Sequence, residues 1–460
     1  MTGRASGVMS SGRGRGFALV VVLFAVGVAT SALLLLQASA FRQAISGREA
    51  VGRLRAEWAA RAGLEATIAR LAAVTEAADT SFAYAAVDEM TGVSRGNIFR
   101  GWDVTGGVAV AEWSIEHFDG ERLFEGPADA HSKVNISKMT REDLLELPGM
   151  TEDVAAAVID WVDADDLVTE FGAEGGYYSR REPPVEPRNG RMRSIEELEL
   201  VAGVDSELVR GEDWNLNGRL DANEDDGDAS WPPDNSDGVL DAGWSGIVTT
   251  ESLDQGLAES GDERVYLPAA TPAELSARVD GLENAQARAM VSAAANAEDG
   301  EGLEIFLGAD LRALAFATGE FSDVELGQIR PLGEEQLRDI FAELTMRDPD
   351  LGPAAGRVNL NLVRREVLDY VTSLREDPGT ADRLIFLRDS RPDGFTSIVD
   401  LLDFASPQQV AALYRDVGVR SVSFVVTSRG TDLSTGIGVE LVATIDRTRL
   451  PIVISEMRER

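Results

Sequence analysis

A twelve-residue stretch near the middle of the chain has the composition and spacing of a calcium-binding loop of the EF-hand type. It reads DWNLNGRLDANE, with Gly218 at the place of the sharp turn. Its oxygen donors fall at the positions that such a loop uses: Asp213, Asn215, Asn217, the carbonyl of Arg219, Asp221 and Glu224. Ca²⁺ takes about six to eight hard oxygen ligands, so the pattern predicts a calcium site. We expect a dissociation constant on the order of 10⁻⁴–10⁻³ M.

The alternative for this stretch is a solvated acidic linker, because the acidic DDGDASWPPDNSDG follows it and no clear helices flank it. The following stretch repeats part of the pattern, at Asn235, Asp237, Gly238 and Asp241. It lacks a ligand at the first and the twelfth position, so we do not predict a second loop site there.

A second acidic cluster lies upstream, in the motif DWVDADDLVTEFGAEGGYY. Within fifteen residues it contains Asp160, Asp163, Asp165, Asp166, Glu170 and Glu174. Like charges this close are costly unless the loop is open to water or holds a cation, and the residues alone leave both possibilities open. Paired carboxylates also serve glycosidases, but nothing here sets the separation of the two groups, so we expect no enzyme.

The composition restricts the class of protein. The chain has 460 residues, which predicts two to four domains. Its 43 basic and 79 acidic residues give a net charge of -36, which repels nucleic acid and anionic lipid and favours divalent cations or basic partners. Cysteine is absent and the histidines are His117 and His131, which excludes disulfides and thiolate sites and argues against zinc or a histidine-based triad.

The amino-terminal stretch RGRGFALVVVLFAVGVATSALLLL predicts a membrane-crossing helix. Twenty uncharged residues begin at Phe17, enough to cross a hydrocarbon layer of ~30 Å at ~1.5 Å per residue. Basic residues precede the helix and should stay in the cytoplasm, so the remaining chain is exported. The pattern resembles prepilin signals, in which a peptidase cuts after the residue equivalent to Gly16 and methylates Phe17. The alternatives are a plain membrane anchor and a cleaved signal peptide.

The elements behind this segment predict one sheet assembled from both ends of the chain. Apolar positions continue at helical spacing, which predicts one long helix from about Phe17 to Ala73. Strand-like runs follow at 108–118, with LFEG able to pair back, and at 420–430, 436–447 and 450–460. A sheet completed by the carboxyl end would make everything between an insertion, in which 270–298 and 303–318 are expected to be helical.

The insertion contains an internal repeat. Three blocks match in the same order: 133–147 with 357–371, 155–165 with 381–391, and 194–198 with 397–401. The first copy reads as helix, LPGM turn and helix, which looks like a helix-hairpin-helix module. Such modules often bind DNA phosphate, but Glu152 and Asp153 follow the first hairpin, and Glu376 and Asp377 lie in the second. We therefore expect protein contact and no nucleic-acid binding.

Together these residues resemble the protein K family of the general secretion pathway, the large minor pseudopilins of type II secretion. The resemblance rests on GRGF before a long apolar helix, AAAVIDWVDADD with GAEGGYY, SIEELELVAGV, RVNLN and closing strands that end in RER. It implies an α+β fold: a pilin-like long helix packed on an antiparallel sheet, interrupted by a large inserted helical domain that binds Ca²⁺. It also implies calcium ligands in and after the acidic motif, at Asp163, Asp165, Asp166 and Glu174.

The resemblance further implies a role. Members sit at the tip of a short periplasmic pseudopilus, prime its assembly and contact other minor pseudopilins, the major pseudopilin, prepilin peptidase and secreted cargo. Their mature fifth residue is characteristically not the Glu of other pilins, and here it is Val21. The insert at 211–244 and RVNLNLVRRE depart from the usual pattern. The other candidate is a membrane-anchored helix-hairpin-helix protein that binds DNA during uptake.

We therefore expect a non-enzymatic, single-pass inner-membrane protein with a periplasmic body. Its expected parts are a prepilin leader (1–16), the transmembrane half of the long helix (17–36) and the first half of a pilin-like α/β part (37–130). The inserted helical domain follows with its first unit (131–205), an acidic calcium-binding insert (206–245) and its second unit (246–417). The strands that complete the sheet come last (418–460).

Overall fold

The structure is a computed structural model that describes most of the chain. The described residues are 14–76, 100–105, 108–119, 122–254, 257–258, 261–298, 300–308, 310–375 and 377–460. The predicted leader up to Arg13 and the hairpin residue Glu376 lie outside them.

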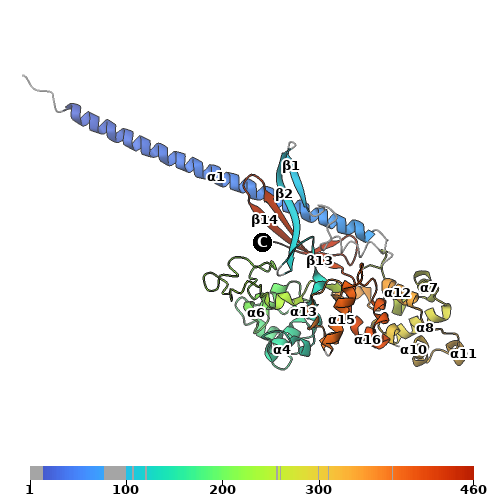
Figure 1. Cartoon of the computed structure of the whole chain (residues 1–460). Coiled ribbons are helices and arrows are strands. Elements are labelled where there is room, and N and C mark those ends of the chain that lie inside the picture. The colour runs from blue at the N-terminus through green and yellow to red at the C-terminus, as the bar shows by residue number, and fades with distance from the viewer. Residues whose placement is uncertain are drawn as a thin grey trace, which may run out of the picture.

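The long helix α1 (Gly14–Glu76) is continuous, which confirms the helix predicted from Phe17 to Ala73. No proline interrupts it, and its first half exposes large apolar side chains such as Phe17 and Leu36. This part, with a mean hydropathy of 2.8, is long and apolar enough to cross a membrane, which fits a single-pass anchor. Figure 1 shows it projecting from the body of the molecule.

The second half of α1 packs on a sheet through small side chains. Ala56, Ala60 and Leu64 are buried there. The closest approach is at Gly430 of the sheet, where a Cβ atom would lie 1.9 Å from the carbonyl oxygen of Ala56. Only glycine lets the helix and the strand come this close.

The sheet is built from both ends of the chain, as predicted. Its order is β1-β2-β13-β14-β15, with all neighbours antiparallel. β2 (Val108–Asp119) and β13 (Ser423–Asp432) pair at the centre. The outer members are β1 (Arg100–Thr105), β14 (Gly438–Asp446) and β15 (Val453–Glu459), while β3 (Arg122–Glu125) pairs with β2 and β4 (Ala128–Asp129) with β13. β1 and β4 were not predicted from the sequence.

The elements between β4 and β13 are mostly helices, and they fall into three stretches. The first contains η1 (Ala130–Ser132), β5 (Val134–Asn135), η2 (Ile136–Lys138), α3 (Arg141–Leu144), α4 (Glu152–Val162), α5 (Gly175–Tyr178), η3 (Ile195–Leu200), α6 (Ser206–Arg210), η4 (Gly243–Gly246) and β6 (Val248–Thr249). The second contains β7 (Leu253–Asp254), β8 (Val265–Tyr266), η5 (Leu267–Ala269), α7 (Pro272–Arg278), α8 (Asn284–Ala295), α9 (Ile305–Gly308), α10 (Leu311–Thr318), α11 (Asp323–Leu326), α12 (Glu334–Glu343), β9 (Leu344–Thr345), η6 (Pro349–Leu351) and β10 (Ala354–Ala355). The third contains β11 (Val358–Asn359), α13 (Arg365–Leu368), α14 (Thr372–Arg375), α15 (Pro378–Asp389), η7 (Ile398–Asp403), α16 (Pro407–Tyr414) and β12 (Val417–Gly418).

The predicted repeat is visible in the element order, and the structure adds a third copy. In each copy a two-residue strand leads to a short helix and then to a longer one: β5, α3 and α4; β8, α7 and α8; β11, α13 and α15, with α14 between the last two helices. Each opening strand pairs in parallel with a later two-residue strand, β6, β9 or β12. The copy that opens with Val265 was missed because its sequence, VYLPAATPAEL, shares few residues with the other two. The designation as helix-hairpin-helix units and the domain boundaries stay predictions.

The buried apolar residues form separate cores. The core of the first stretch contains Trp161, Tyr178 and Trp244. The second and third stretches share a larger core that includes Phe306 and Phe395. Figure 1 places α4 and α6 near one end of the helical region and α7, α8, α10 and α11 at the other.

Candidate metal centre

The carboxyl end of α4 positions two carboxylates of the acidic motif one turn apart. The buried face of the helix, which includes Val158 and Trp161, fixes it against the first core. Asp160 is fully buried, and Asp163 is the residue at which the helix ends. Residues three apart lie on the same side of a helix, so both side chains reach the same space.

The loop after α4 folds back over Asp160 and brings a third carboxylate to it. The backbone N–H of Thr169 donates to Asp160 Oδ1 at 3.0 Å. Gly172 passes so close that a Cβ atom there would lie 2.1 Å from Asp160 Oδ2. Glu174 follows as the residue that precedes α5, and its side chain is 4% exposed.

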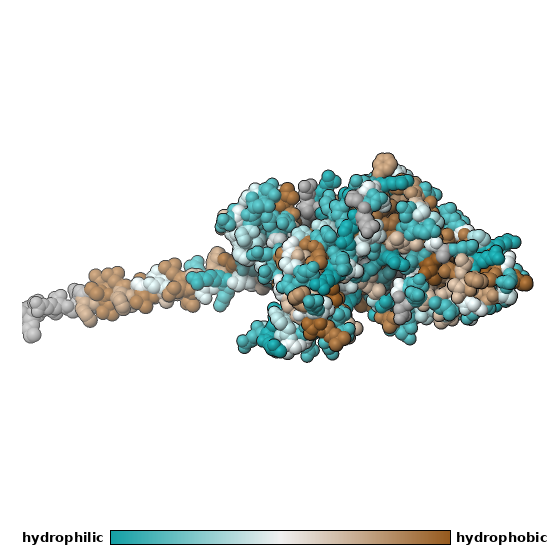
Figure 2. Space-filling view, turned by 90° about the horizontal axis from the view of Figure 1, so that it is seen from below, coloured by the Kyte–Doolittle hydropathy of each residue, from teal (hydrophilic) through white to brown (hydrophobic). Residues whose placement is uncertain are grey.

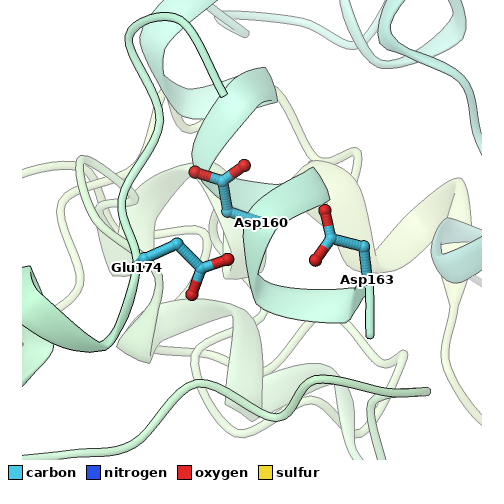
Figure 3. A group of neighbouring side chains, drawn as sticks. All are labelled: Asp160, Asp163 and Glu174. Carbon is cyan, nitrogen blue, oxygen red and sulfur yellow. The ribbon is translucent and has the colours of Figure 1, made fainter. Parts of the chain in front are cut away.

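Asp160, Asp163 and Glu174 form a three-carboxylate group. One oxygen of each lies within 4.8 Å of the others. Figure 3 shows the three side chains facing one another. Within the described part of the chain this is the only cluster of three or more acidic or histidine ligands at such distances.

Two oxygens of the group have no hydrogen-bond partner. Asp163 Oδ1 and Glu174 Oε1 are both buried and unbonded. Burial, followed by the charge of Asp165, raises the pKa of Asp163. Burial also raises the pKa of Glu174, and the charges of Asp160 and Asp163 add to the effect. A buried carboxylate is normally paired or hydrogen-bonded, but among the described residues no basic side chain forms an ion pair with this group.

These residues fit a hard cation. Carboxylate oxygens are the ligands that Ca²⁺ prefers, and an ion between Asp160, Asp163 and Glu174 would bond the two free oxygens and cancel the repulsion. Its contribution would be charge neutralisation and rigidity of the loop. No reaction step needs it.

The predicted ligands of this motif are only partly brought together. Asp163 and Glu174 join the group, but Asp165 and Asp166 are exposed. Asp165 Oδ1 accepts the N–H of Leu167 at 2.7 Å, and Asp166 Oδ1 accepts from the Asn189 amide at 3.2 Å. Asp160 was not among the predicted ligands. Its spacing of three residues from Asp163 on a helix is the signal that could have found it.

The twelve-residue loop folds around its own carboxylates. Asp213 accepts the N–H groups of Asn217 and Gly218, both at 2.9 Å. The turn requires glycine, because φ of Gly218 is +70°. The side-chain amides of Asn215 and Asn217 donate to Asp221 Oδ2 at 3.0 and 2.8 Å. The side chains of Asn215 and Asn217 thus meet at Asp221, while Asp213 holds the backbone of the turn.

Glu224 closes the loop from the other side. Its carboxylate accepts the N–H of Trp214 at 3.1 Å and that of Asp221 at 3.0 Å. Glu224 is 1% exposed and Asp213 is 2% exposed. Burial, with the charges of Asp213 and Asp221, raises the pKa of Glu224, and burial raises that of Asp213. This donor set also fits a hard cation.

The loop rests on the sheet. A Cβ atom at Gly218 would lie 2.9 Å from the carbonyl oxygen of Phe118, which belongs to β2. The guanidinium of Arg219 lies over the Phe118 ring, 5.5 Å from its centre. Nη2 of Arg460 donates to the carbonyl of Leu216 at 2.6 Å. The acidic insert therefore connects the helical region to the sheet.

The partial pattern after the loop, from Asn235 to Asp241, lacks ligands of its own at the first and twelfth positions. Carboxylates from outside this pattern take these two places. The N–H of Gly238 donates to Asp225 Oδ1 at 3.0 Å, as the central glycine of the first loop does to its first aspartate. The N–H of Asp241 donates to Glu212 Oε2 at 3.1 Å, as in the first loop an aspartate does to the closing glutamate. Residues distant in sequence thus complete the arrangement.

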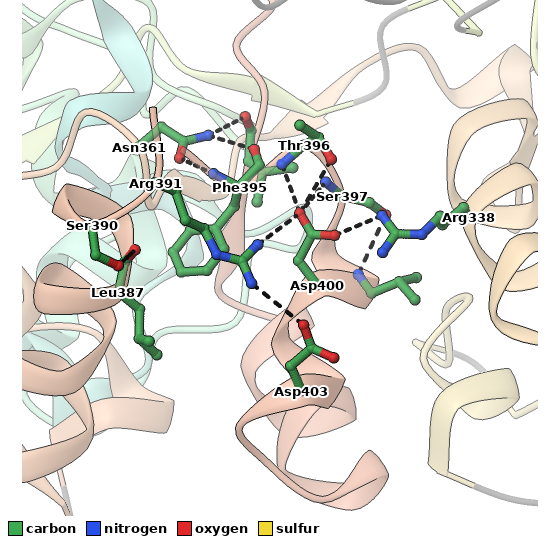
Figure 4. Close-up of polar contacts among 12 residues, drawn as sticks. Arg338, Asn361, Leu387, Ser390, Arg391, Phe395, Thr396, Ser397, Asp400 and Asp403 are labelled. Carbon is green, nitrogen blue, oxygen red and sulfur yellow. Dashed lines mark hydrogen bonds and ion pairs between the residues drawn. The ribbon is translucent and has the colours of Figure 1, made fainter. Parts of the chain in front are cut away.

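In the later copy an arginine pairs with Asp400, which aligns with Glu197 of the first copy, where Arg188 forms the equivalent ion pair. In the alignment of 155–165 with 381–391, Asp165 is replaced by Arg391. Its guanidinium lies 3.5 Å from Asp400 and 3.4 Å from Asp403, as Figure 4 shows. Arg338 bonds the same Asp400 at 2.6 Å. Arginine balances the carboxylates there.

The predicted processing site lies at the start of α1. Gly16 is inside the helix, and the side chain of Phe17 is 74% exposed. Cleavage and methylation at this bond stay a prediction.

Residues 127–211 match the family model described as Type II secretion system (T2SS), protein K. This segment of the chain is similar to type II secretion protein K. This confirms the resemblance seen in the sequence. The matched segment includes the three-carboxylate group and ends before the twelve-residue loop.

Two comparisons give proteins of type II secretion systems to which the chain is similar. One is the type II secretion system protein K of Pectobacterium carotovorum subsp. carotovorum, 37% identical over 75 residues. That alignment spans 16% of this chain and 23% of the relative. The other is a chain in the crystal structure of the GspK-GspI-GspJ complex from the enterotoxigenic Escherichia coli type 2 secretion system. It aligns with a TM-score of 0.43 and 11% identity, over 90% of this chain and 99% of that chain.

Proposed function

We propose that this protein is a minor pseudopilin at the tip of a type II secretion pseudopilus, where it primes assembly for the export of folded proteins. The observation that carries the proposal is the protein K match at residues 127–211. It lies in a helical region inserted between β4 and β13 of one sheet, behind a helix that can cross a membrane. We propose no enzymatic activity, because the family is structural.

The amino terminus supports processing by prepilin peptidase. Cleavage after Gly16 would leave Phe17 as the first residue of α1, with the apolar half of the helix in the inner membrane and the body in the periplasm. Val21 would be the fifth residue, where most pilins carry Glu. That Glu neutralises the terminus of the subunit ahead, and a tip subunit has no subunit ahead of it.

The proposed partners follow from this position. They are the other minor pseudopilins and the major pseudopilin, with secreted cargo as a further contact. The E. coli relative is part of a complex of three such proteins, which supports minor pseudopilins as neighbours.

We also propose Ca²⁺ as a structural ion at two places. One is the group of Asp160, Asp163 and Glu174, and the other is the loop from Asp213 to Glu224. The unbonded buried oxygens support the first, and the donor spacing supports the second.

Mass analysis of the mature amino terminus tests the assignment. We expect a methylated Phe17, and we expect deletion of the gene to abolish secretion until the full chain is restored. Any other terminus, or normal secretion without the protein, would contradict the proposal.

The DNA-uptake alternative is less favoured. Glu152 and Asp153 open α4 at the place where a phosphate would bind. Binding of duplex DNA measured at two salt concentrations separates the candidates, since a steep salt dependence would favour the DNA receptor.

A further inference from the structure

The loop over the three-carboxylate group exposes three large apolar side chains within five residues. Leu167, Val168 and Phe171 are 76%, 62% and 66% exposed. Outside α1, no other stretch of five consecutive residues in the described chain contains three exposed large apolar side chains. On the face that Figure 2 shows, the body is largely hydrophilic, with hydrophobic areas scattered over it. Clustered exposure of this kind marks contact surfaces.

This apolar loop, Leu167 to Phe171, is held by specific bonds. Its first N–H donates to Asp165 Oδ1 at 2.7 Å, and the N–H of Thr169 donates to the buried Asp160. Phe171 has φ of +72°, a conformation that bulky residues avoid. The backbone thus adopts a strained geometry in which the Phe171 ring faces solvent.

The charges around the apolar loop restrict the class of partner that can bind there. Asp165, Asp166 and Glu170 are exposed beside the apolar side chains. These carboxylates and the net charge of -36 oppose an anionic lipid surface. They also oppose a second copy of the chain, since its own loop carries the same charges. They complement a protein pocket whose rim carries Lys and Arg.

We propose that Leu167, Val168 and Phe171 insert into an apolar pocket of a partner protein with a basic rim. This inference rests on the proposed function and deepens it, because it names the surface through which the tip subunit meets a component of the secretion machinery or its cargo. The acidic residues of the loop set the charge that the partner must match.

Site-specific photocrosslinking in secreting cells tests the proposal. A photoreactive phenylalanine analogue replaces Phe171 in the full chain, and the control places it at Phe316 on α10, which is 69% exposed. We expect an adduct with a second protein at position 171 only, and a crosslinked peptide rich in apolar and basic residues. No adduct, a lipid adduct, an adduct with another copy of the chain or a peptide without basic residues would overturn the inference.

A charge reversal on the same protein gives the second readout. We expect Glu170→Lys to lower the adduct yield severalfold, while Glu263→Lys, at an exposed acidic residue before β8, leaves it unchanged. Equal yields would overturn the inference. If the chain is methylated at Phe17 and supports secretion but forms no adduct, this inference fails and the proposed function stands. An unmethylated chain that is dispensable for secretion defeats the proposed function itself.

Discussion

Asp160 and Phe386 occupy the same position in two copies of one structural unit, but Asp160 is fully buried and Phe386 is 71% exposed. In the first copy the carboxylate at this position joins two others, with no cation among the side chains of the group. In the later copy Arg391 balances the nearby carboxylates. At this position the two copies therefore differ: the first has a carboxylate that belongs to a group of three, and the later copy has an exposed phenylalanine.

Calcium removal should destabilise the body. Because an ion bound only to the folded state stabilises it by mass action, about 2.7 kcal/mol is expected at one hundred times the dissociation constant. Thermal unfolding with Ca²⁺ and with chelator measures the difference. The double variant Asp163→Asn and Glu174→Gln should lose the share of the calcium effect that comes from this group and, in chelator, should melt higher than the native chain, since the repulsion is gone. A native-like response to Ca²⁺ in that variant would contradict the site.

The twelve-residue loop should bind an ion of its own. Glu224→Ala removes a buried ligand, so native mass spectrometry in Ca²⁺ should show one ion fewer than the native chain. Asn223→Ala is the control, because Asn223 lies in the loop at a position that EF-hand loops do not use as a ligand. An unchanged ion count in Glu224→Ala would mean that the loop is only an acidic linker.

Substitution of one glycine should disrupt the packing of α1 on the sheet and destabilise the protein. Gly430→Ala places a methyl group 1.9 Å from the carbonyl of Ala56, so we expect a loss of about 1–3 kcal/mol or more. Gly47→Ala is the control, because nothing lies within 4 Å of its Cβ position in α1. That change should be neutral or stabilising by about 0.5–1 kcal/mol. Denaturant unfolding of both variants checks the contrast, and equal midpoints would contradict the close packing.

Low pH should destabilise the turn at the end of β13, where Asp432 contacts Arg55 of α1. Burial alone would raise the pKa of Asp432, but hydrogen bonds from Thr435 and Ser434 and the guanidinium of Arg55 lower it to about 2. Because the folded pKa lies below the ordinary 3.8, this stability is present above about pH 4 and is lost as the pH falls toward 2. Asp432→Asn should be less stable than the native chain at neutral pH and should lose stability less steeply over that range. Unfolding curves between pH 2 and pH 7 in chelator compare the two, and parallel profiles would contradict the shift.

Local patterns in the sequence determined the elements of the fold. The unbroken apolar run predicted α1, alternation predicted β2, β13, β14 and β15, and three matched blocks predicted two of the three repeated units. The spacing of polar residues also identified the acidic motif and the loop from Asp213 to Glu224. These features depend on residues near one another in the chain, so periodicity and spacing suffice to find them.

Only the tertiary structure decided which carboxylates meet. Asp165 and Asp166 lie next to Asp163 in sequence but bond to a backbone amide and to Asn189, while Asp160 reaches Glu174 because the loop folds back past Gly172. The completion of the second loop by Glu212 and Asp225, and the third copy of the repeat, depend equally on folding. In each case the decisive contact joins residues that spacing does not relate, since packing and backbone geometry bring them together.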